Sequence, residues 1–240
     1  MDASKVREQL VEQEKAKPEL ARMRGESAAF VAASFRQFGD ALQVAGQLIG
    51  PNRKDGSSPF KFGSDEVYGV SLLLRIGAEL IENTTKLFET GQTYSASALL
   101  RQIVEIEYLA WAFNYRKGDA EKWLRSDKSE RWKVFQPAKL RKAAGGTFRA
   151  KDYGYHCDMG GHPTPSAMTL LQNDPLVIQL LMSDLLGHMS GIWGHFVDWG
   201  KQHQELSSIF SEYQSLGEAT GKCLSDWKAT DPLVRLGPPP

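Results

Sequence analysis

The sequence has few cysteines, no excess charge of either sign and no long uninterrupted hydrophobic run. Of its 240 residues only two are cysteines, too few for the disulfide framework that stabilises small secreted domains. Lysine plus arginine and aspartate plus glutamate balance at 29 each, so no field of the whole molecule attracts nucleic acid or an anionic membrane. Any such affinity has to be local.

Signals for export or for a membrane span are also missing. The first seventeen residues are too charged for the apolar region of a signal peptide. The most apolar stretch, 175–199, is interrupted by two aspartates and two histidines, which a bilayer would tolerate poorly. We therefore expect a cytoplasmic protein with reduced thiols and no membrane partner, in which this stretch is a core helix.

The sequence lacks alternating β patterns, internal repeats and phosphate-binding glycine motifs, and its hydrophobic periodicity is helical. In residues 93–115 apolar side chains recur at helical spacing and cover two faces, so this helix is expected to be central. Ser64 and Asp174 are typical helix N-caps, and Asp174 is followed by a first-turn proline. The predicted fold class is all-α, a helical bundle.

The chain divides into one main domain with two appendages. We expect a charged helical arm over residues 1–25, a helical bundle domain over 26–228 and a disordered tail over 229–240, which ends in three prolines. An irregular stretch is expected at 145–165, after a glycine pair. The predicted helices span residues 3–24, 27–48, 64–89, 93–115, 119–126, 129–135, 137–144, 174–204 and 206–227.

A polar line runs along the predicted central helix. Ser97, Arg101, Glu105 and Tyr108 follow one another at spacings of three or four residues, so they share one face between apolar flanks. Arg101 and Glu105 can form an ion pair that fixes the packing of the helix, because buried charges require partners. The alternative is that Arg101, Glu105 and Tyr108 bind a ligand.

Potential metal ligands are concentrated in the segment 153–163. His156, Cys157, Asp158 and His162 lie close together there, but no CxxC pair is present and the histidines are six residues apart, which matches no zinc signature. Histidines that hydrogen-bond to the bundle beside a glycine turn explain the segment better than a metal site does. We therefore predict no metal and no cofactor, and place His162 among the candidate ligand-binding residues.

The long helix expected over 174–204 carries two further histidines. His188 and His195 are seven residues apart and share one face, and Asp184 precedes His188 by one turn. An aspartate at this spacing can orient a histidine and favour its charged form. Histidines on an apolar helix are also common as hydrogen-bonded groups of a core or an interface.

Positive charge is concentrated in residues 116–151. This segment has twelve lysines and arginines against four acidic residues, with two tryptophans and two phenylalanines between them. Cations interleaved with aromatic rings are typical of surfaces that hold phosphates and stack bases. Arg141 and Lys142 are therefore candidate ligand-binding residues, although a solvated helical face has the same composition.

Two resemblances to known families follow from these motifs. The stretch Ala98–Glu105 (ALLRQIVE), followed later by the His162-Pro-Thr turn, resembles an uncharacterised family of helical bacterial proteins, which implies a helical fold. Arg149 and His156, with six residues between them, are similar to the Arg-to-His motif of HEPN domains. The second resemblance implies metal-independent cleavage of RNA by paired protomers, with His156 as general acid or base and Arg149 stabilising the phosphate charge. Gly154 interrupts the helix that this family has there.

Three hypotheses follow for the function. The first is binding of RNA or a phosphorylated small molecule through residues 116–151, with HEPN-like ribonuclease chemistry at Arg149 and His156. The second is a non-catalytic interaction or scaffold protein that forms a homodimer through the arm and the helix that bears His188 and His195. The third is a metal-dependent enzyme that uses a His/Asp/Glu cluster, for which the sequence offers His156, Asp158, His162 and Glu105.

Overall fold

The computed structural model describes Glu8 and residues 17–50, 62–148 and 150–236, and the regular elements within these residues are all helical. The all-α bundle predicted from the sequence is confirmed. In chain order the elements are α2 (Pro18–Leu48), α3 (Asp65–Glu89), α4 (Thr93–Tyr115), α5 (Asp119–Arg125), α6 (Lys128–Val134), α7 (Pro137–Ala143), α8 (Ala150–His156), the π-helical turn η1 (Cys157–Gly161), the 3-10 helix η2 (Pro165–Gln172), α9 (Pro175–Lys201), η3 (Gln204–Leu206), α10 (Ser207–Glu212), α11 (Gln214–Thr230) and η4 (Pro232–Leu236).

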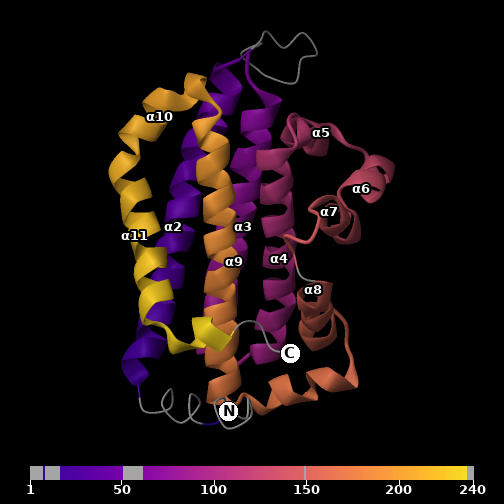
Figure 1. Cartoon of the computed structure of the whole chain (residues 1–240), viewed down its shortest axis with the longest axis vertical. Coiled ribbons are helices and arrows are strands. Elements are labelled where there is room, and N and C mark those ends of the chain that lie inside the picture. The colour runs from indigo at the N-terminus through magenta and orange to yellow at the C-terminus, as the bar shows by residue number, and fades with distance from the viewer. Residues whose placement is uncertain (1–7, 9–16, 51–61, 149, 237–240) are drawn as a thin grey trace.

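The core lies between the long helices α2, α3, α4 and α9 (Figure 1). α3 packs against α2 and α4, and α9 packs against α4 and α2. Phe35, Leu74, Ile103 and Leu185, one from each helix, are almost completely buried. Burial of each such side chain contributes roughly 1.5–3 kcal/mol, so these contacts supply much of the driving force for the bundle.

The predicted helix starts and the central helix are confirmed. The hydroxyl oxygen of Ser64 accepts a hydrogen bond from the Val67 N–H, and the carboxylate of Asp174 accepts one from the Leu176 N–H. α4 is buried on several sides, as its two apolar faces predicted. α9 is, by length and composition, apolar enough to cross a membrane. Its contacts with α4 and α2 inside the bundle account for that composition.

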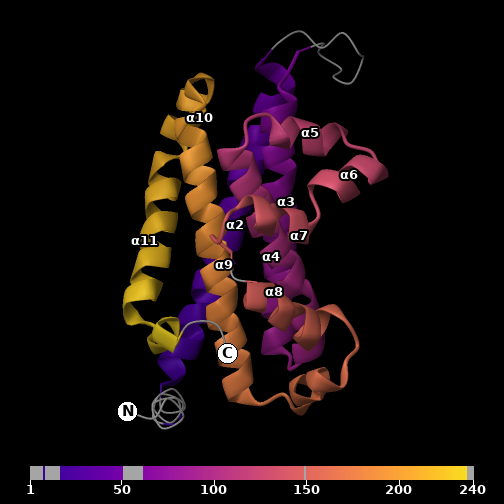
Figure 2. The ribbon, with the colours of Figure 1, turned by 45° about the vertical axis from the view of Figure 1, so that its right-hand side comes forward.

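The shorter helices lie on two sides of the core (Figure 2). α5, α6, α7 and α8 follow one another along the side formed by α3 and α4, whereas α10 and α11 lie on the opposite side, next to α2 and α9. The stretch 145–165, predicted to be irregular, contains α8 and η1. Local sequence underestimates such short helices, because their stability comes from packing on α4.

Two predicted boundaries differ from the structure. α2 runs without a break from Pro18 past residue 25, so the end of the predicted arm is the first part of a bundle helix; residues 1–7 and 9–16 lie outside the described residues. The tail predicted from residue 229 begins inside α11 and continues into η4, where Leu233 is buried; residues 237–240 lie outside the described residues. In both places, tertiary packing orders segments whose local sequence is polar or rich in proline.

A buried ion pair explains both differences. The guanidinium of Arg24 in α2 donates two hydrogen bonds to the carboxylate of Asp231, at 2.8 and 2.7 Å, and both side chains are completely buried. The carboxylate also accepts from the indole N–H of Trp227 and the backbone N–H of Leu233. Burial alone would raise the pKa of Asp231, but these hydrogen bonds and the Arg24 charge hold that pKa below its usual value. The pair therefore joins the two ends of the described chain.

We expect Asp231→Asn to lower the free energy of unfolding by about 3–5 kcal/mol, because it leaves the Arg24 charge buried without a counter-charge. Urea unfolding at pH 7 measures this loss. The matched control is Asp226→Asn, whose ion pair with Lys222 is mostly exposed and contributes about 0.5 kcal/mol or less.

The difference in unfolding free energy between wild type and Asp231→Asn depends on pH. A carboxylate with a lowered pKa stabilises the fold above its unfolded pKa of about 4, and that stabilisation is lost as the pH falls through the folded pKa. The gap between wild type and Asp231→Asn should therefore narrow below about pH 4. Equal stability of the two proteins at pH 7 would contradict the role given to this pair.

Candidate metal centre

The π-helical turn η1 places His156 inside the bundle. His156 ends α8, and the turn that follows packs directly on α4. A Cβ atom at Gly160 would lie 2.6 Å from the Ser97 carbonyl carbon, and one at Gly161 would lie 2.5 Å from the Cδ of Arg101. Only glycine fits this close approach. The turn thereby carries the His156 ring to a position with no exposed surface.

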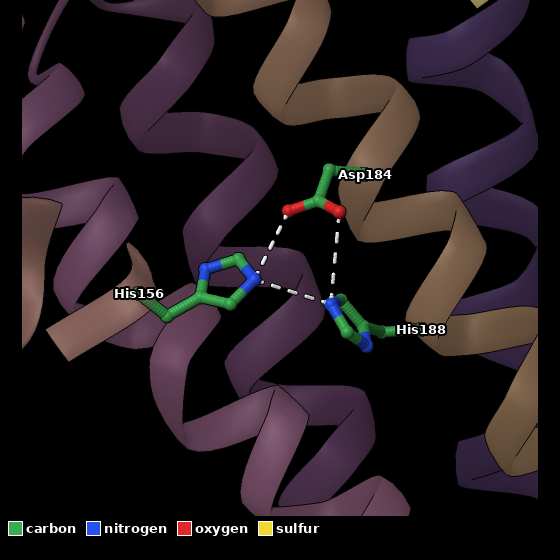
Figure 3. Close-up of side chains that lie close together, drawn as sticks. All are labelled: His156, Asp184 and His188. Atoms are coloured by element: carbon green, nitrogen blue, oxygen red, sulfur yellow. Dashed lines mark hydrogen bonds and ion pairs between the residues drawn. The ribbon is translucent and has the colours of Figure 1, made fainter. Parts of the chain in front are cut away.

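His156, Asp184 and His188 meet between α8 and α9 (Figure 3). The Nε2 atom of His156 lies 3.3 Å from a carboxylate oxygen of Asp184 and 3.3 Å from the Nε2 atom of His188. Nε2 of His188 lies 3.7 Å from the other Asp184 oxygen. Asp184 and His188 are one turn apart on α9, so a single helix supplies two of the three groups.

Glu107 of α4 orients the His188 ring from behind. Its carboxylate lies 2.6 Å from Nδ1 of His188, so the imidazole donates its Nδ1–H there and directs the Nε2 lone pair toward His156 and Asp184. Gly191, one turn after His188, provides the space: a Cβ atom there would lie 1.9 Å from a Glu107 oxygen. The tautomer and the direction of His188 are therefore set by α4.

His156 is electrically neutral in this environment. Burial, together with the neighbouring His188, lowers the pKa of His156 to about 3. A neutral imidazole keeps one nitrogen lone pair, which is the form that binds metal ions.

The cluster has the dimensions of a three-ligand metal centre. Tetrahedral zinc binds histidine nitrogen at about 2.0–2.1 Å, which places two such nitrogens roughly 3.3 Å apart. The two Nε2 atoms have this separation, and the Asp184 carboxylate lies at a similar distance. His188 also has the carboxylate partner on its second nitrogen that metal-bound histidines typically have. Among the described residues these three form the one group whose ligand atoms all lie within 4.8 Å of one another.

A second polar cluster forms on another face of α4. Arg101 pairs with Glu105 at 2.6 Å, and the Tyr153 hydroxyl donates to the same carboxylate at 2.9 Å. The Arg141 guanidinium lies over the Tyr153 ring, 4.8 Å from its centroid. Burial, and then Glu105, raise the pKa of Tyr153 to about 12 against the opposing effect of Arg101. The predicted residues Arg101, Glu105 and Arg141 are thus brought together around Tyr153: Arg101 and Glu105 form an ion pair, and Arg141 stacks on the tyrosine ring.

The other predicted site residues lie apart from one another. Tyr108 is buried, with its ring against Phe148 and 5.9 Å from the Tyr153 ring. His162 and Lys142 are exposed, and Arg149 lies outside the described residues. Asp158 is exposed as well, so the metal set expected from the sequence, His156 with Asp158, His162 and Glu105, does not converge. His195 lies among the rings of Tyr115 and Phe148.

The sequence matches no family model, no curated protein and no solved structure. The resemblances to the helical bacterial family and to HEPN domains therefore stay predictions. Glu107 is the residue of this centre that sequence reasoning missed. Its only signal is an acidic residue between buried positions of a central helix, which does not identify its partner on α9.

We expect Gly191→Ala to destabilise the protein, because the new methyl group displaces the Glu107 carboxylate and removes a charge-assisted hydrogen bond worth about 1.5–3 kcal/mol. Thermal and urea unfolding measure this loss. Gly187→Ala and Gly194→Ala are matched controls on the same helix, since a Cβ atom there meets nothing within 4 Å. Both controls should gain up to about 1 kcal/mol from helix propensity. A similar gain at Gly191 would contradict the proposed packing of Glu107.

Proposed function

We propose that the protein is a metal-dependent enzyme in which His156, Asp184 and His188 bind a divalent transition-metal ion, most suitably zinc. The observation that carries the proposal is the 3.3 Å separation of two buried histidine nitrogens beside a carboxylate. Two imidazoles and one carboxylate are a ligand set typical of catalytic zinc, in which three protein ligands leave the fourth position to water.

Such a centre supports hydrolysis. A zinc ion held by His156, Asp184 and His188 would act as a Lewis acid that activates water near neutral pH. Asp184 is the most exposed of the three ligands, with 16% of its side chain accessible, so water and substrate would approach the centre from its side. Glu107 supports the centre by holding His188 and by strengthening it as a ligand.

We expect the full-length protein, stripped with chelator and titrated with Zn²⁺ by calorimetry, to bind one ion. Asp184→Asn should weaken binding at least about 100-fold because it removes a charged ligand, and Glu107→Gln should weaken it about 10–100-fold. Asp158→Asn and His162→Ala are matched controls, since both residues offer ligand atoms in the same segment but are exposed. They should bind zinc as the wild type does.

Cobalt substitution tests the ligand set directly. Co²⁺ bound by two imidazoles and a carboxylate in tetrahedral geometry should give visible absorption bands that Asp184→Asn alters and Asp158→Asn leaves unchanged. The centre would be refuted if the wild type bound no stoichiometric zinc, or if Asp158→Asn and Asp184→Asn weakened zinc binding equally.

A second candidate function is binding of RNA through the exposed side of α6 and α7. Trp132 has 64% of its surface exposed, and Lys128, Lys133 and Lys139 beside it in the sequence are exposed too. These helices lie along the same side of the bundle as α8 (Figures 1 and 2). Other cations of the segment serve the fold: Arg116 pairs with Asp119, Arg125 pairs with Asp65, and the Arg141 guanidinium lies over the Tyr153 ring. The surface for phosphates is thus smaller than residues 116–151 as a whole.

We expect Trp132→Ala to weaken binding of a fluorescent single-stranded RNA about 5–150-fold in anisotropy titrations, because it removes one base-stacking platform. Phe30→Ala, an exposed aromatic residue of α2, is the control and should bind as the wild type does. Affinity should fall steeply as salt increases.

The fate of the bound RNA separates the two enzymatic hypotheses. Cleavage that resists chelator and is lost in His156→Ala would support the HEPN-like mechanism, whereas cleavage that requires zinc and Asp184 would support the metal centre. In this structure the His156 ring is buried and its Nε2 atom faces Asp184 and His188, which is the arrangement of a metal ligand and not of a general acid or base presented to RNA. That burial favours the metal centre.

A further inference from the structure

The outer side of α9 borders a cavity of about 620 Å³. Its walls are α9 on one side and α10 with the start of α11 on the other, and Phe38 of α2 forms part of its floor. This volume lies within the range of about 300–1,000 Å³ that is usual for small-molecule sites. None of the three proposed metal ligands lines it.

Aromatic rings dominate the inner part of the cavity. The Phe38 ring centroid lies 5.5 Å from that of Trp193, 5.3 Å from that of Phe196 and 5.6 Å from that of Tyr213. Phe210 of α10 closes the group at 5.8 Å from Phe196. Rings at tilted and edge-on angles offer both faces and edges to a further ring, so a planar aromatic ligand fits this lining best.

The charged side chains of the rim have partners of their own. Glu218 is bonded to a neutral amide and therefore keeps its charge, and His203 lies between two carboxylates. The pairs are Lys201 with Asp198 at 2.8 Å, His203 with Glu66 and Glu205 at 3.4 and 2.9 Å, and Glu218 with Gln214 at 2.8 Å. Acidic groups outnumber basic ones in these pairs, which disfavours an anionic ligand, and the aromatic lining favours an uncharged one.

Gly217 keeps part of the cavity open. It lies on α11 and lines the cavity, and a Cβ atom there would sit 3.7 Å from Phe38 and 4.0 Å from Trp193, which is ordinary contact. A larger side chain would fit there and would fill part of the cavity. The sequence has glycine at this position even though glycine within a helix costs about 1 kcal/mol relative to alanine. We propose that the cavity between α9, α10 and α11 is a binding site for an uncharged aromatic small molecule.

The test uses N-phenyl-1-naphthylamine, an uncharged aromatic probe whose fluorescence rises in apolar surroundings. The wild type should bind one equivalent saturably, with energy transfer from tryptophan, and Gly217→Leu should weaken binding at least about tenfold, equivalent to about 1.4 kcal/mol. Gly221→Leu is the matched control: it lies one turn further along α11, does not line the cavity and makes the same change in helix propensity. It should bind within about twofold of the wild type.

A second variant keeps the test decisive if Gly217→Leu fails to fold. Ser211→Trp places a large ring at an exposed position of the cavity rim, and it should weaken binding without disturbing the core. Asp184→Asn should bind the probe as the wild type does, so failure of the metal centre and failure of this site are distinguishable. Unsaturable binding, or equal affinity in Gly217→Leu and Gly221→Leu, would overturn the proposal.

Discussion

The contact between Glu107 and His188 is the constraint on which the proposed centre depends. It joins α4 to α9 inside an apolar bundle, where an imidazole and a carboxylate without partners would each be costly. Because Glu107 accepts the Nδ1 proton, the other nitrogen of His188 is left to face His156 and Asp184. Gly191 leaves the space on α9 that the Glu107 carboxylate occupies, since any side chain at that position would collide with it.

The two polar clusters on α4 differ in what their arrangement can do. In the first, Arg101 and the Tyr153 hydroxyl both bind the Glu105 carboxylate, and Arg141 covers the tyrosine ring, so the one carboxylate is already bound and two guanidinium groups lie beside it. In the second, two imidazole nitrogens and a carboxylate converge, and all three are acceptor groups once their protons are removed. Only the second arrangement is suited to a cation. The first is suited to fixing α8 against α4, which in turn positions His156.

Sequence patterns predicted the parts of this fold that are governed by local rules. Each of these features depends on residues close together in the sequence of a single helix: the caps at Ser64 and Asp174, the extent of α4 and the Arg101–Glu105 pair. The position of His156 does not, because it depends on glycines in η1 fitting against the backbone of α4, a contact between segments about sixty residues apart. Asp184 and His188 could be paired from the sequence because they are four residues apart on one helix. Glu107 and His156 could not be joined to them, because they lie on other helices and are brought near only by packing. The end of α11 was misplaced because Asp231 is ordered by Arg24, 207 residues away.

The stability of the fold bears on how the centre would work. Structural zinc sites in small domains supply the folding energy themselves. Here the long helices bury a continuous apolar core, and Arg24 with Asp231 joins its ends, so the groups of the centre are positioned by contacts that involve no metal. When no cation is bound, the Nε2 atoms of His156 and His188 share a hydrogen bond beside the Asp184 carboxylate, and a metal ion has to replace that bond. That exchange lowers the affinity for the metal ion, but the three ligands are already in position before the ion binds. A preorganised centre with three ligands suits catalysis, where the metal keeps a position for a reacting group, better than it suits a purely structural role.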